Sequence, residues 1–142
     1  GVIDVIQYAY NQVIAKNKEP KFIAIFEEIY PFRNPQTLSK MAKLMNSEDY
    51  DTLIATKFEP RGIFINKQKD FQAQLDRFIP SKLKNKKIYI SMLGYGTFIK
   101  PLLIKTGEII GEKTGIYPLK NDLGSITLKT NQDIKNFKKI LT

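Results

Sequence analysis

The apolar residues of the first fifteen positions recur at steps of three and four. Such spacing places them on one side of an α-helix, so we expect an amphipathic helix over residues 2–15. A complete apolar face at the very start of a domain is unusual, and we interpret it as a sign that a further segment precedes it. The positions that form this face are Val2, Val5, Ile6, Ala9, Tyr10, Val13 and Ile14.

The next stretch predicts a strand, a helix and a second strand. The short apolar run Phe22–Phe26 is typical of a strand buried on both faces of a parallel sheet. Asn34 and Pro35 provide a helix start, with asparagine as the N-cap and proline in the first turn. A second strand is expected over 51–56. A crossover of this kind normally builds a parallel sheet.

Shorter elements are expected in the remainder of the chain. No repeat or linker divides the sequence, so we predict a single α/β domain over residues 1–142. The expected elements are an edge or hairpin strand at 62–66, a helix at 71–79, strands at 87–92, 115–119 and 125–128, a helical turn at 101–105, and a final helix behind the capping-box-like segment 130–133.

The chain contains no cysteine and no histidine. Without cysteine there are no disulfides, thiolate nucleophiles or zinc ribbons. Without histidine, Ser-His-Asp triads, Cys-His dyads and the commonest metal ligand are excluded. Any metal site must use oxygen ligands, which favours magnesium, calcium or manganese. No apolar run is long enough to cross a bilayer and no signal-peptide pattern opens the chain, so we expect a cytoplasmic protein.

Lysine dominates the charge of the chain. The formal net charge is +9, which is compatible with nucleic-acid binding. Arginine, the better reader of phosphates and bases, occurs only at three positions, and the excess of lysine indicates a general compositional preference. We therefore interpret the densest lysine cluster, at 82–87, as solvated surface, with a polyanion contact as the alternative. Nucleic acid is an unlikely partner.

One loop has the position expected of a ligand site. Ligands of open α/β sheets bind beyond the carboxyl ends of the strands, and the segment 27–33 leaves the first strand there. Arg33 precedes the expected N-cap, so its guanidinium could pair with a phosphate or carboxylate. The alternative is that Arg33 pairs only with Glu27 or Glu28 and anchors the loop.

Two further segments hold candidate groups. Gly94 and Gly96 would let a ligand approach the backbone, and Thr97 adds a hydroxyl. No Gly-Lys-Ser/Thr follows, so this is not a phosphate loop, and a plain turn is the alternative. Residues 126–130 lead into the final helix, where Asp133 is most simply an acid that favours the helix dipole.

The order of these features resembles the C-terminal part of the cytidylyltransferases that make CMP-activated sugar acids, the acylneuraminate type. The spore-coat polysaccharide nucleotidyltransferases are a close second match. The resemblance runs from residue 1 to about residue 141. It rests on the strand before Tyr30-Pro-Phe-Arg-Asn34, the strand at 51–56, and the segments Gly94–Ile99, Gly111–Pro118 and Thr127–Asp133.

This resemblance implies a fold and a site. The fold would be a three-layer, Rossmann-like domain of the nucleotidyltransferase (glycosyltransferase-A-like) kind, with a mostly parallel sheet flanked by helices. The family's loop after the strand resembles Gln-Pro-Thr-Ser-Pro-Leu-Arg and helps to hold the sugar; Pro31 and Arg33 match it, whereas residues 27–30 differ. The implied substrate-binding residues are Glu27, Arg33, Gly94, Gly96 and Thr97.

Two departures separate the chain from the family pattern. The family's closing motif resembles Asp-Ile-Asp-Thr-Pro-Glu-Asp, whose first two acids support the catalytic magnesium. Thr127 and Lys129 stand in their places, and a charged lysine cannot ligate a metal. We therefore expect no metal ligand set, unless Glu27 or Glu28 supplies one, and expect Lys129 to neutralise phosphate charge. The family's N-terminal CTP-binding strand and loop have no counterpart, so this portion is expected to be missing.

Two functions remain open at this point. The first is the sugar-binding portion of a cytidylyltransferase that transfers CMP from CTP to a sugar acid in polysaccharide biosynthesis, incomplete by itself. The second is a catalytically degenerate relative that binds a sugar or a protein partner. The resemblance also implies a sugar acid and a cytidine nucleotide as ligands, and a homodimer formed through residues 62–79.

Overall fold

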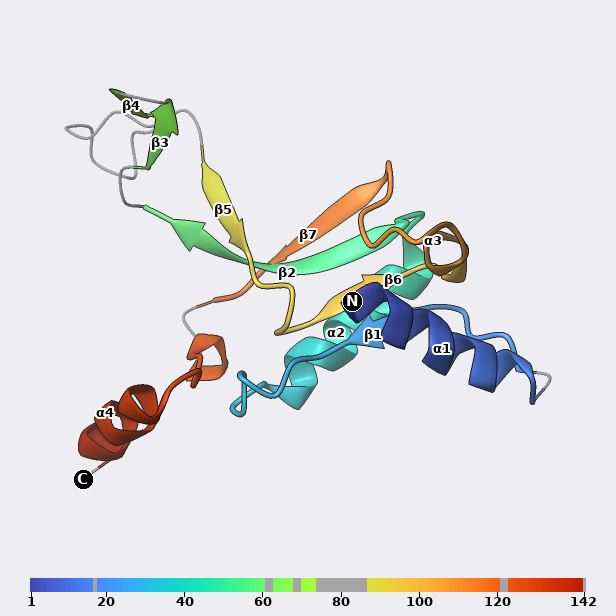
Figure 1. Cartoon of the computed structure of the whole chain (residues 1–142), viewed down its shortest axis with the longest axis horizontal. Coiled ribbons are helices and arrows are strands. Elements are labelled where there is room, and N and C mark those ends of the chain that lie inside the picture. The colour runs from blue at the N-terminus through green and yellow to red at the C-terminus, as the bar shows by residue number, and fades with distance from the viewer. Residues whose placement is uncertain (17, 61–62, 68–69, 74–86, 121–122, 142) are drawn as a thin grey trace.

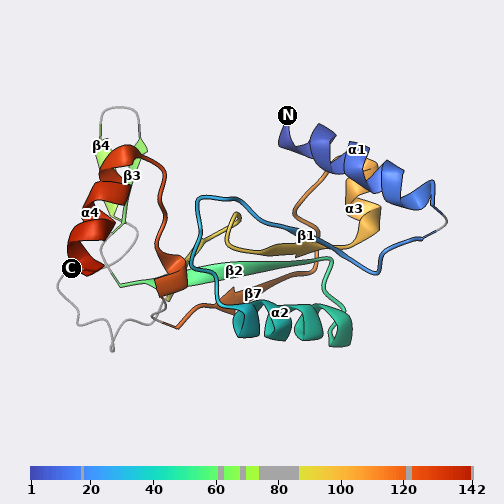
Figure 2. The ribbon, with the colours of Figure 1, turned by 90° about the horizontal axis from the view of Figure 1, so that it is seen from below.

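A β-sheet with helices on both faces forms the body of the protein (Figures 1 and 2). This arrangement confirms the expected α/β class. The structure is a computed structural model, and it describes residues 1–16, 18–60, 63–67, 70–73, 87–120 and 123–141.

The sheet is built around the long strand β2 (Thr52–Glu59). Strands β5 (Ile88–Ser91) and β6 (Thr97–Ile99) follow one another along one edge of β2, and both are antiparallel to it. Strand β7 (Thr114–Pro118) runs parallel to β2 along the other edge. Strand β1 (Ile23–Ile25) pairs with β6, so it is the outer strand of the described sheet.

The expectation of a mostly parallel, Rossmann-like sheet is wrong. Among the described strands of this sheet, the pairings β1–β6, β2–β5 and β2–β6 are antiparallel, and only β2–β7 is parallel. Strands β1 and β2 do run in the same direction, joined through α2 (Pro35–Ser47), but β6 lies between them. Within the run Phe22–Phe26, residues Ile23–Ile25 form a partly buried outer strand, because the hydrophobicity of a short run does not specify its neighbours.

Two apolar clusters lie on opposite faces of the sheet. Helix α2 covers one face, where Met41 packs with Leu53 in a fully buried position. Helices α1 (Val2–Ile14) and α3 (Pro101–Thr106) cover the other face around buried Ile104. Figure 2 shows α2 below the sheet and α1 with α3 above it. The sheet is thus the middle of three layers.

Two elements extend from this body (Figure 1). Strands β3 (Phe64–Lys67) and β4 (Asp70–Ala73) form a separate antiparallel hairpin, which confirms the hairpin alternative for residues 62–66. Helix α4 (Asn131–Leu141) lies beyond a 3-10 turn at Leu123–Ser125.

Two sequence-based expectations fail in these outlying parts. The helix expected over 71–79 is wrong at its beginning, because residues 71–73 belong to β4; the rest lies outside the described residues. The strand expected over 125–128 is also wrong, since these residues are a 3-10 turn followed by irregular backbone. Most of the lysine cluster at 82–87 also lies outside the described residues.

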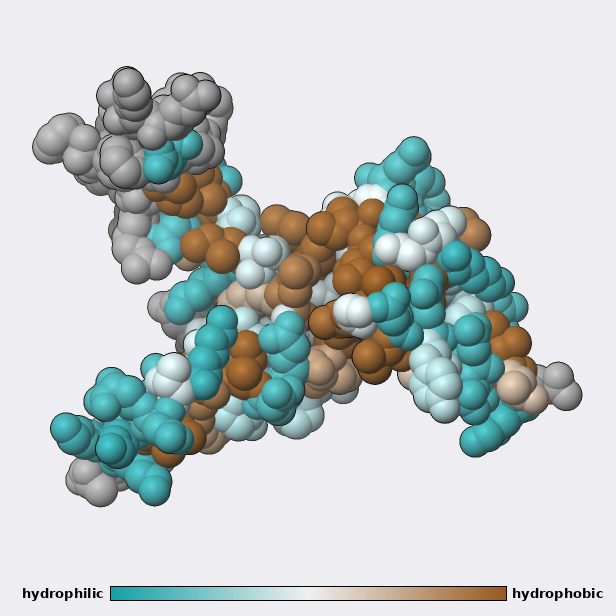
Figure 3. Space-filling view, in the orientation of Figure 1, coloured by the Kyte–Doolittle hydropathy of each residue, from teal (hydrophilic) through white to brown (hydrophobic). Residues whose placement is uncertain are grey.

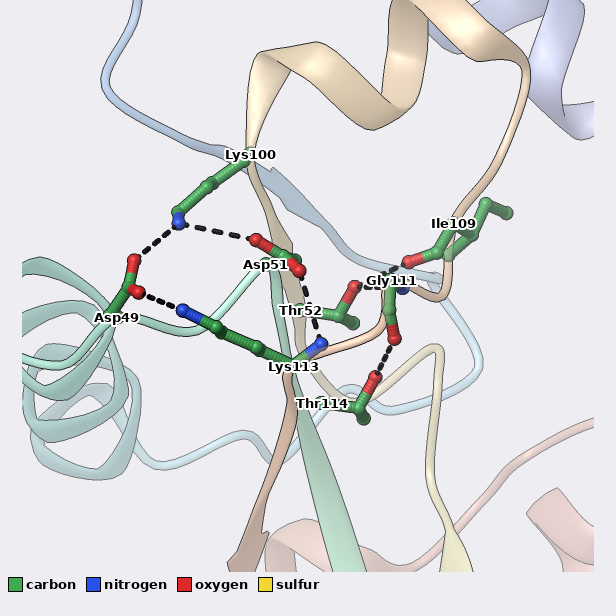
Figure 4. Close-up of polar contacts among 8 residues, drawn as sticks. All are labelled: Asp49, Asp51, Thr52, Lys100, Ile109, Gly111, Lys113 and Thr114. Carbon is green, nitrogen blue, oxygen red and sulfur yellow. Dashed lines mark hydrogen bonds and ion pairs between the residues drawn. The ribbon is translucent and has the colours of Figure 1, made fainter.

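An ion-pair network closes the amino-terminal end of β2 (Figure 4). The Lys100 ammonium lies 2.9 Å from Asp49 Oδ1 and 3.2 Å from Asp51 Oδ1. Lys113 pairs with Asp49, and its backbone N–H donates to Asp51 Oδ2 at 3.1 Å. These contacts tie the start of β2 to the segments beside it. They lie at the end of the sheet opposite the candidate site, so we assign them a structural role.

Candidate functional site

Strands β1, β2 and β7 run in the same direction, so their carboxyl ends lie at one end of the sheet. The loop 27–34 leaves β1 at this end and leads into α2. Asn34 caps that helix as expected, because its Oδ1 accepts N–H bonds from Gln36 at 2.8 Å and Thr37 at 3.3 Å. The loop is therefore held between two regular elements.

Arg33 joins this loop to the glycine segment between β5 and β6. Its Nε donates to the carbonyl oxygen of Tyr95, and its Nη2 donates to that of Gly94, each at 3.0 Å. The guanidinium carbon also lies 5.4 Å from the ring centre of Phe26 and 5.8 Å from that of Tyr30. The alternative, in which Arg33 pairs only with Glu27 or Glu28, is therefore wrong, because its bonds go to backbone carbonyls. Arg33 is instead a clamp on the backbone of the glycine segment.

Glu27 and Gly94 meet at the beginning of the same loop. The Glu27 N–H donates to the Gly94 carbonyl at 2.8 Å. A Cβ atom on residue 94 would lie 2.4 Å from the Glu27 Cδ and 2.7 Å from its Cβ. Glycine is therefore required here for close approach rather than for an unusual backbone angle. Three predicted residues, Glu27, Arg33 and Gly94, thus lie together.

Tyr95 is a residue of this site that the sequence reasoning missed. Its side chain is fully buried, and its hydroxyl accepts the Asn34 N–H at 3.3 Å. Its ring packs edge-on against Tyr30 with centres 5.9 Å apart. Burial and the nearby Glu27 carboxylate raise the pKa of Tyr30, so that phenol stays neutral. The available signal was an aromatic residue between two glycines.

Gly96 and Thr97 face the interior rather than an open surface. The Gly96 carbonyl accepts the Ala55 N–H at 3.0 Å, as part of the sheet. The Thr97 hydroxyl donates to the Leu93 carbonyl at 2.9 Å, and only 1% of the residue is exposed. In this conformation neither residue presents a polar group to a ligand. They shape the turn that Arg33 holds.

The segment leading to α4 comes alongside the same loop. The Leu128 N–H donates to the Ile29 carbonyl at 2.9 Å. Asp133 Oδ2 accepts the N–H bonds of Lys129 at 3.0 Å and Thr130 at 2.8 Å, and the Thr130 hydroxyl accepts the Asp133 N–H. This is the expected capping box, and these bonds, chiefly those from Thr130, lower the pKa of Asp133. The Lys129 side chain is exposed.

A hollow of about 460 Å³ opens between the loop and α4. Its floor includes the stacked rings of Phe32 and Phe137, whose centres are 4.6 Å apart. Arg33, Asn34 and Gln36 contribute the polar groups, and the size is in the range of small-molecule sites. The hollow therefore offers a cationic group, amides and an apolar wall to a small polar ligand.

Thr127 and Lys129 stand where the resembled family has its magnesium-supporting acids, and Asp133 follows them. Asp133 is occupied with backbone bonds, Thr127 has no charge and Lys129 repels a cation. Across the part of the chain that the structure describes, no three histidine, cysteine, aspartate or glutamate residues gather as metal ligands. The described residues at the positions that the resemblance aligns with the magnesium site thus do not fit that ion. The described helices include none that is long and apolar enough to cross a membrane.

Comparison with known proteins does not identify a family for this chain. No protein-family model matches it, and no curated protein matches its sequence.

Proposed function

We propose that this chain is the sugar-binding portion of a cytidylyltransferase, with CTP held by a segment outside these residues. The single observation that carries the proposal is the Arg33 clamp. It brings the loop that resembles the family's sugar-binding loop onto the glycine segment that also belongs to the resemblance. Arg33 thereby joins residues 61 positions apart in the sequence, and it also lines the hollow beside the loop after β1.

The reaction of such an enzyme indicates what the residues around the hollow must do. A sugar-acid hydroxyl attacks the α-phosphorus of CTP, a P–O bond forms, and the bond to pyrophosphate breaks while the hydroxyl proton passes to a base. These residues contribute positioning, because holding the sugar in line is a large part of the rate enhancement. The guanidinium of Arg33 and the amides of Asn34 and Gln36 suit a sugar acid, which carries a carboxylate and several hydroxyls.

Calorimetric titration with CMP-sialic acid and, separately, with CTP plus magnesium tests the proposal. We expect the purified chain to bind the sugar nucleotide but not CTP. Asn34→Ala would weaken helix capping as well as ligand binding, so its effect would be ambiguous. Gln36→Ala is the sharper variant and should weaken binding of the sugar nucleotide. Ser39→Ala, at an exposed position on the same helix, is the matched control and should leave binding unchanged. A chain that binds neither ligand, or that turns over CTP by itself, would contradict the proposal.

A second candidate is a non-catalytic relative that binds a sugar or a protein partner. The specific observation in its favour is the replacement of the family's two metal-supporting acids by Thr127 and Lys129. Sugar-acid binding without turnover in a chain that also contains a CTP-binding segment would favour this candidate over the enzyme.

The proposal extends to the setting of the protein. We place it in the cytoplasm, where CTP is available, and as a homodimer. The segment 62–79, through which the resemblance implies dimerisation, is described only in part, as the β3–β4 hairpin.

A further inference from the structure

The free edge of β1 is unusually apolar for the outer strand of a sheet. Outer strands are generally protected by charged residues, proline or a covering element. Here the segment Phe22–Phe26 has no charged residue, and its strand residues Ile23–Ile25 are only partly buried. Among the described strands, β1 pairs only with β6, so its other edge has no strand beside it (Figure 1).

Helix α1 has a second apolar stripe beside this edge. One row of residues, including Ile6 and Tyr10, packs into the core. A neighbouring row at steps of three and four remains exposed, with Val2 and Val5 each 68% exposed and Val13 43% exposed. A helix with only one buried side does not need such a row, so the stripe indicates a second contact.

The stripe and the strand edge line one apolar hollow. The hollow has a volume of about 370 Å³ and is lined by Val5, Ala9 and Val13 of α1 and by the residues of β1. No charged residue lines it, although the chain as a whole carries a net charge of +9. Figure 3 shows apolar residues gathered where the start of α1 lies over the sheet.

We propose that this face is the interface with a second copy of the chain, in which β1 pairs antiparallel with β1 of the other copy. Centred on Ala24, a two-fold pairing sets Ile23 opposite Ile25 of the second copy and Phe22 opposite Phe26. The same register sets Lys21 opposite Glu27 of the second copy, at both ends of the pair. Apolar residues thus meet apolar residues, and the two flanking charges are complementary.

This pairing accounts for both unexplained features at once. A two-fold axis perpendicular to the sheet makes the two sheets continuous, so the backbone groups on the free edge of β1 gain partners. It also places the two copies of α1 on the same face, where the exposed stripe of each copy can pack on the other. The pairing involves no ligand, and it places the dimer interface at β1 instead of the segment 62–79 through which the resemblance implies dimerisation.

Sedimentation velocity over a micromolar to sub-millimolar concentration series tests the interface. We expect a monomer–dimer equilibrium that Val5→Lys weakens on the order of 100-fold, since it buries an unpaired ammonium. Val5 is exposed in the monomer, so this variant should remain folded, as checked by urea unfolding of dilute protein. Asn11→Lys is the matched control, because it adds the same charge on the opposite, exposed side of α1 and should change dimerisation less than about twofold.

A charge reversal tests the register. Lys21→Glu would face Glu27 of the second copy and should weaken the dimer about tenfold, whereas Lys18→Glu, at an exposed position outside the pair, should have little effect. Amide hydrogen exchange at Ala24, whose N–H points to the free edge because the backbone groups of Ile23 and Ile25 face β6, should slow as protein concentration rises. A chain that stays monomeric over the whole concentration series overturns the proposal. The free edge of β1 would then be available to a strand of a different polypeptide. The proposal is also overturned by a dimer that Val5→Lys and Asn11→Lys affect equally, which would be held elsewhere, such as at the β3–β4 hairpin.

Discussion

At the scale of single residues, Arg33 holds the glycine segment and is also the residue to which we assign sugar binding. A guanidinium has five N–H donors, and the backbone of the glycine segment receives bonds from Nε and Nη2. Arg33 is also among the residues that line the hollow beside the loop after β1. Arg33 is therefore first a positioning residue, and the ligand contact that we propose for it depends on the same geometry.

Substitutions of Arg33 test this role. Arg33→Ala removes the donor of the Tyr95 carbonyl and one of the two donors of the Gly94 carbonyl, and we expect a loss of about 2 kcal/mol in the free energy of unfolding. Arg33→Lys keeps the charge but cannot reproduce the two-pronged bond, so it should recover less than half of that loss. Urea unfolding measures both. Full recovery of stability by lysine would contradict the clamp and would indicate that charge alone matters at this position.

Gly107 gives a second residue-level prediction, based on backbone strain alone. It follows α3 with φ of +78°, in the left-handed region, and a Cβ atom at this position would have Gln7 Nε2 as its nearest neighbour, at 3.8 Å. Gly107→Ala should therefore cost about 1 kcal/mol of stability without any clash. Gly107→Asn should cost less, because asparagine tolerates this conformation. Equal losses for the two variants in urea unfolding would show that strain is not the cause.

At the scale of elements, the sequence predicts the helices better than the sheet. Periodicity and caps located α1, α2 and α4, since Asn34 with Pro35 and Thr130 with Asp133 specify helix starts locally. The directions and neighbours of strands depend instead on partners far along the chain. Nothing within Phe22–Phe26 shows that Phe98 will lie opposite Ala24, so the parallel sheet was a wrong expectation.

For the candidate site, too, local features could be predicted from the sequence and long-range contacts could not. The position of the loop after β1 followed from a general rule for strands, and the structure brings Glu27, Arg33 and Gly94 together there. The buried state of the Thr97 hydroxyl was not predictable, because it depends on how the turn folds back to the Leu93 carbonyl. Likewise, the bond from Asn34 to the Tyr95 hydroxyl joins residues 61 apart.

The ion-pair network at the start of β2 supports a prediction about pH. Bonds from Lys113 and Lys100 lower the pKa of Asp49 to about 2. Because the pKa is lower in the folded than in the unfolded chain, the network stabilises the protein above about pH 4 and loses this effect as the pH falls towards about 2. Asp49→Asn should therefore be less stable than the wild type at neutral pH, and the difference should vanish on acidification.

Urea unfolding at a series of pH values measures this difference. Asp49 is 71% exposed at its side chain, so added salt should also reduce the effect. Glu48→Gln, an exposed neighbour, is the matched control and should show a small difference that does not change with pH. An Asp49→Asn difference that persists unchanged at low pH would mean that the asparagine acts through packing rather than through lost charge.

At the scale of the whole molecule, the position of α4 decides whether the site has its second wall. The helix lies away from the sheet in both ribbon views (Figures 1 and 2). The described contacts that join its region to the loop after β1 include the Leu128–Ile29 backbone bond and the stacked rings of Phe32 and Phe137. Since Phe137 also lines the hollow, the docking of α4 and the formation of the site are coupled.

Phe137→Ala tests this coupling. Removing the ring should undock α4, so that limited proteolysis after lysines in the segment before the helix becomes several-fold faster. The sheet should keep its protease resistance, because the two apolar clusters found among the described residues include none from α4. Lys135→Ala, on the exposed side of the same helix, is the matched control and should leave the cleavage rate near that of the wild type. If the site depends on the docked helix, Phe137→Ala should also weaken binding of CMP-sialic acid about tenfold, as the stacked wall is lost. Faster cleavage with unchanged ligand affinity would separate the two roles and restrict the binding wall to the loop held by Arg33.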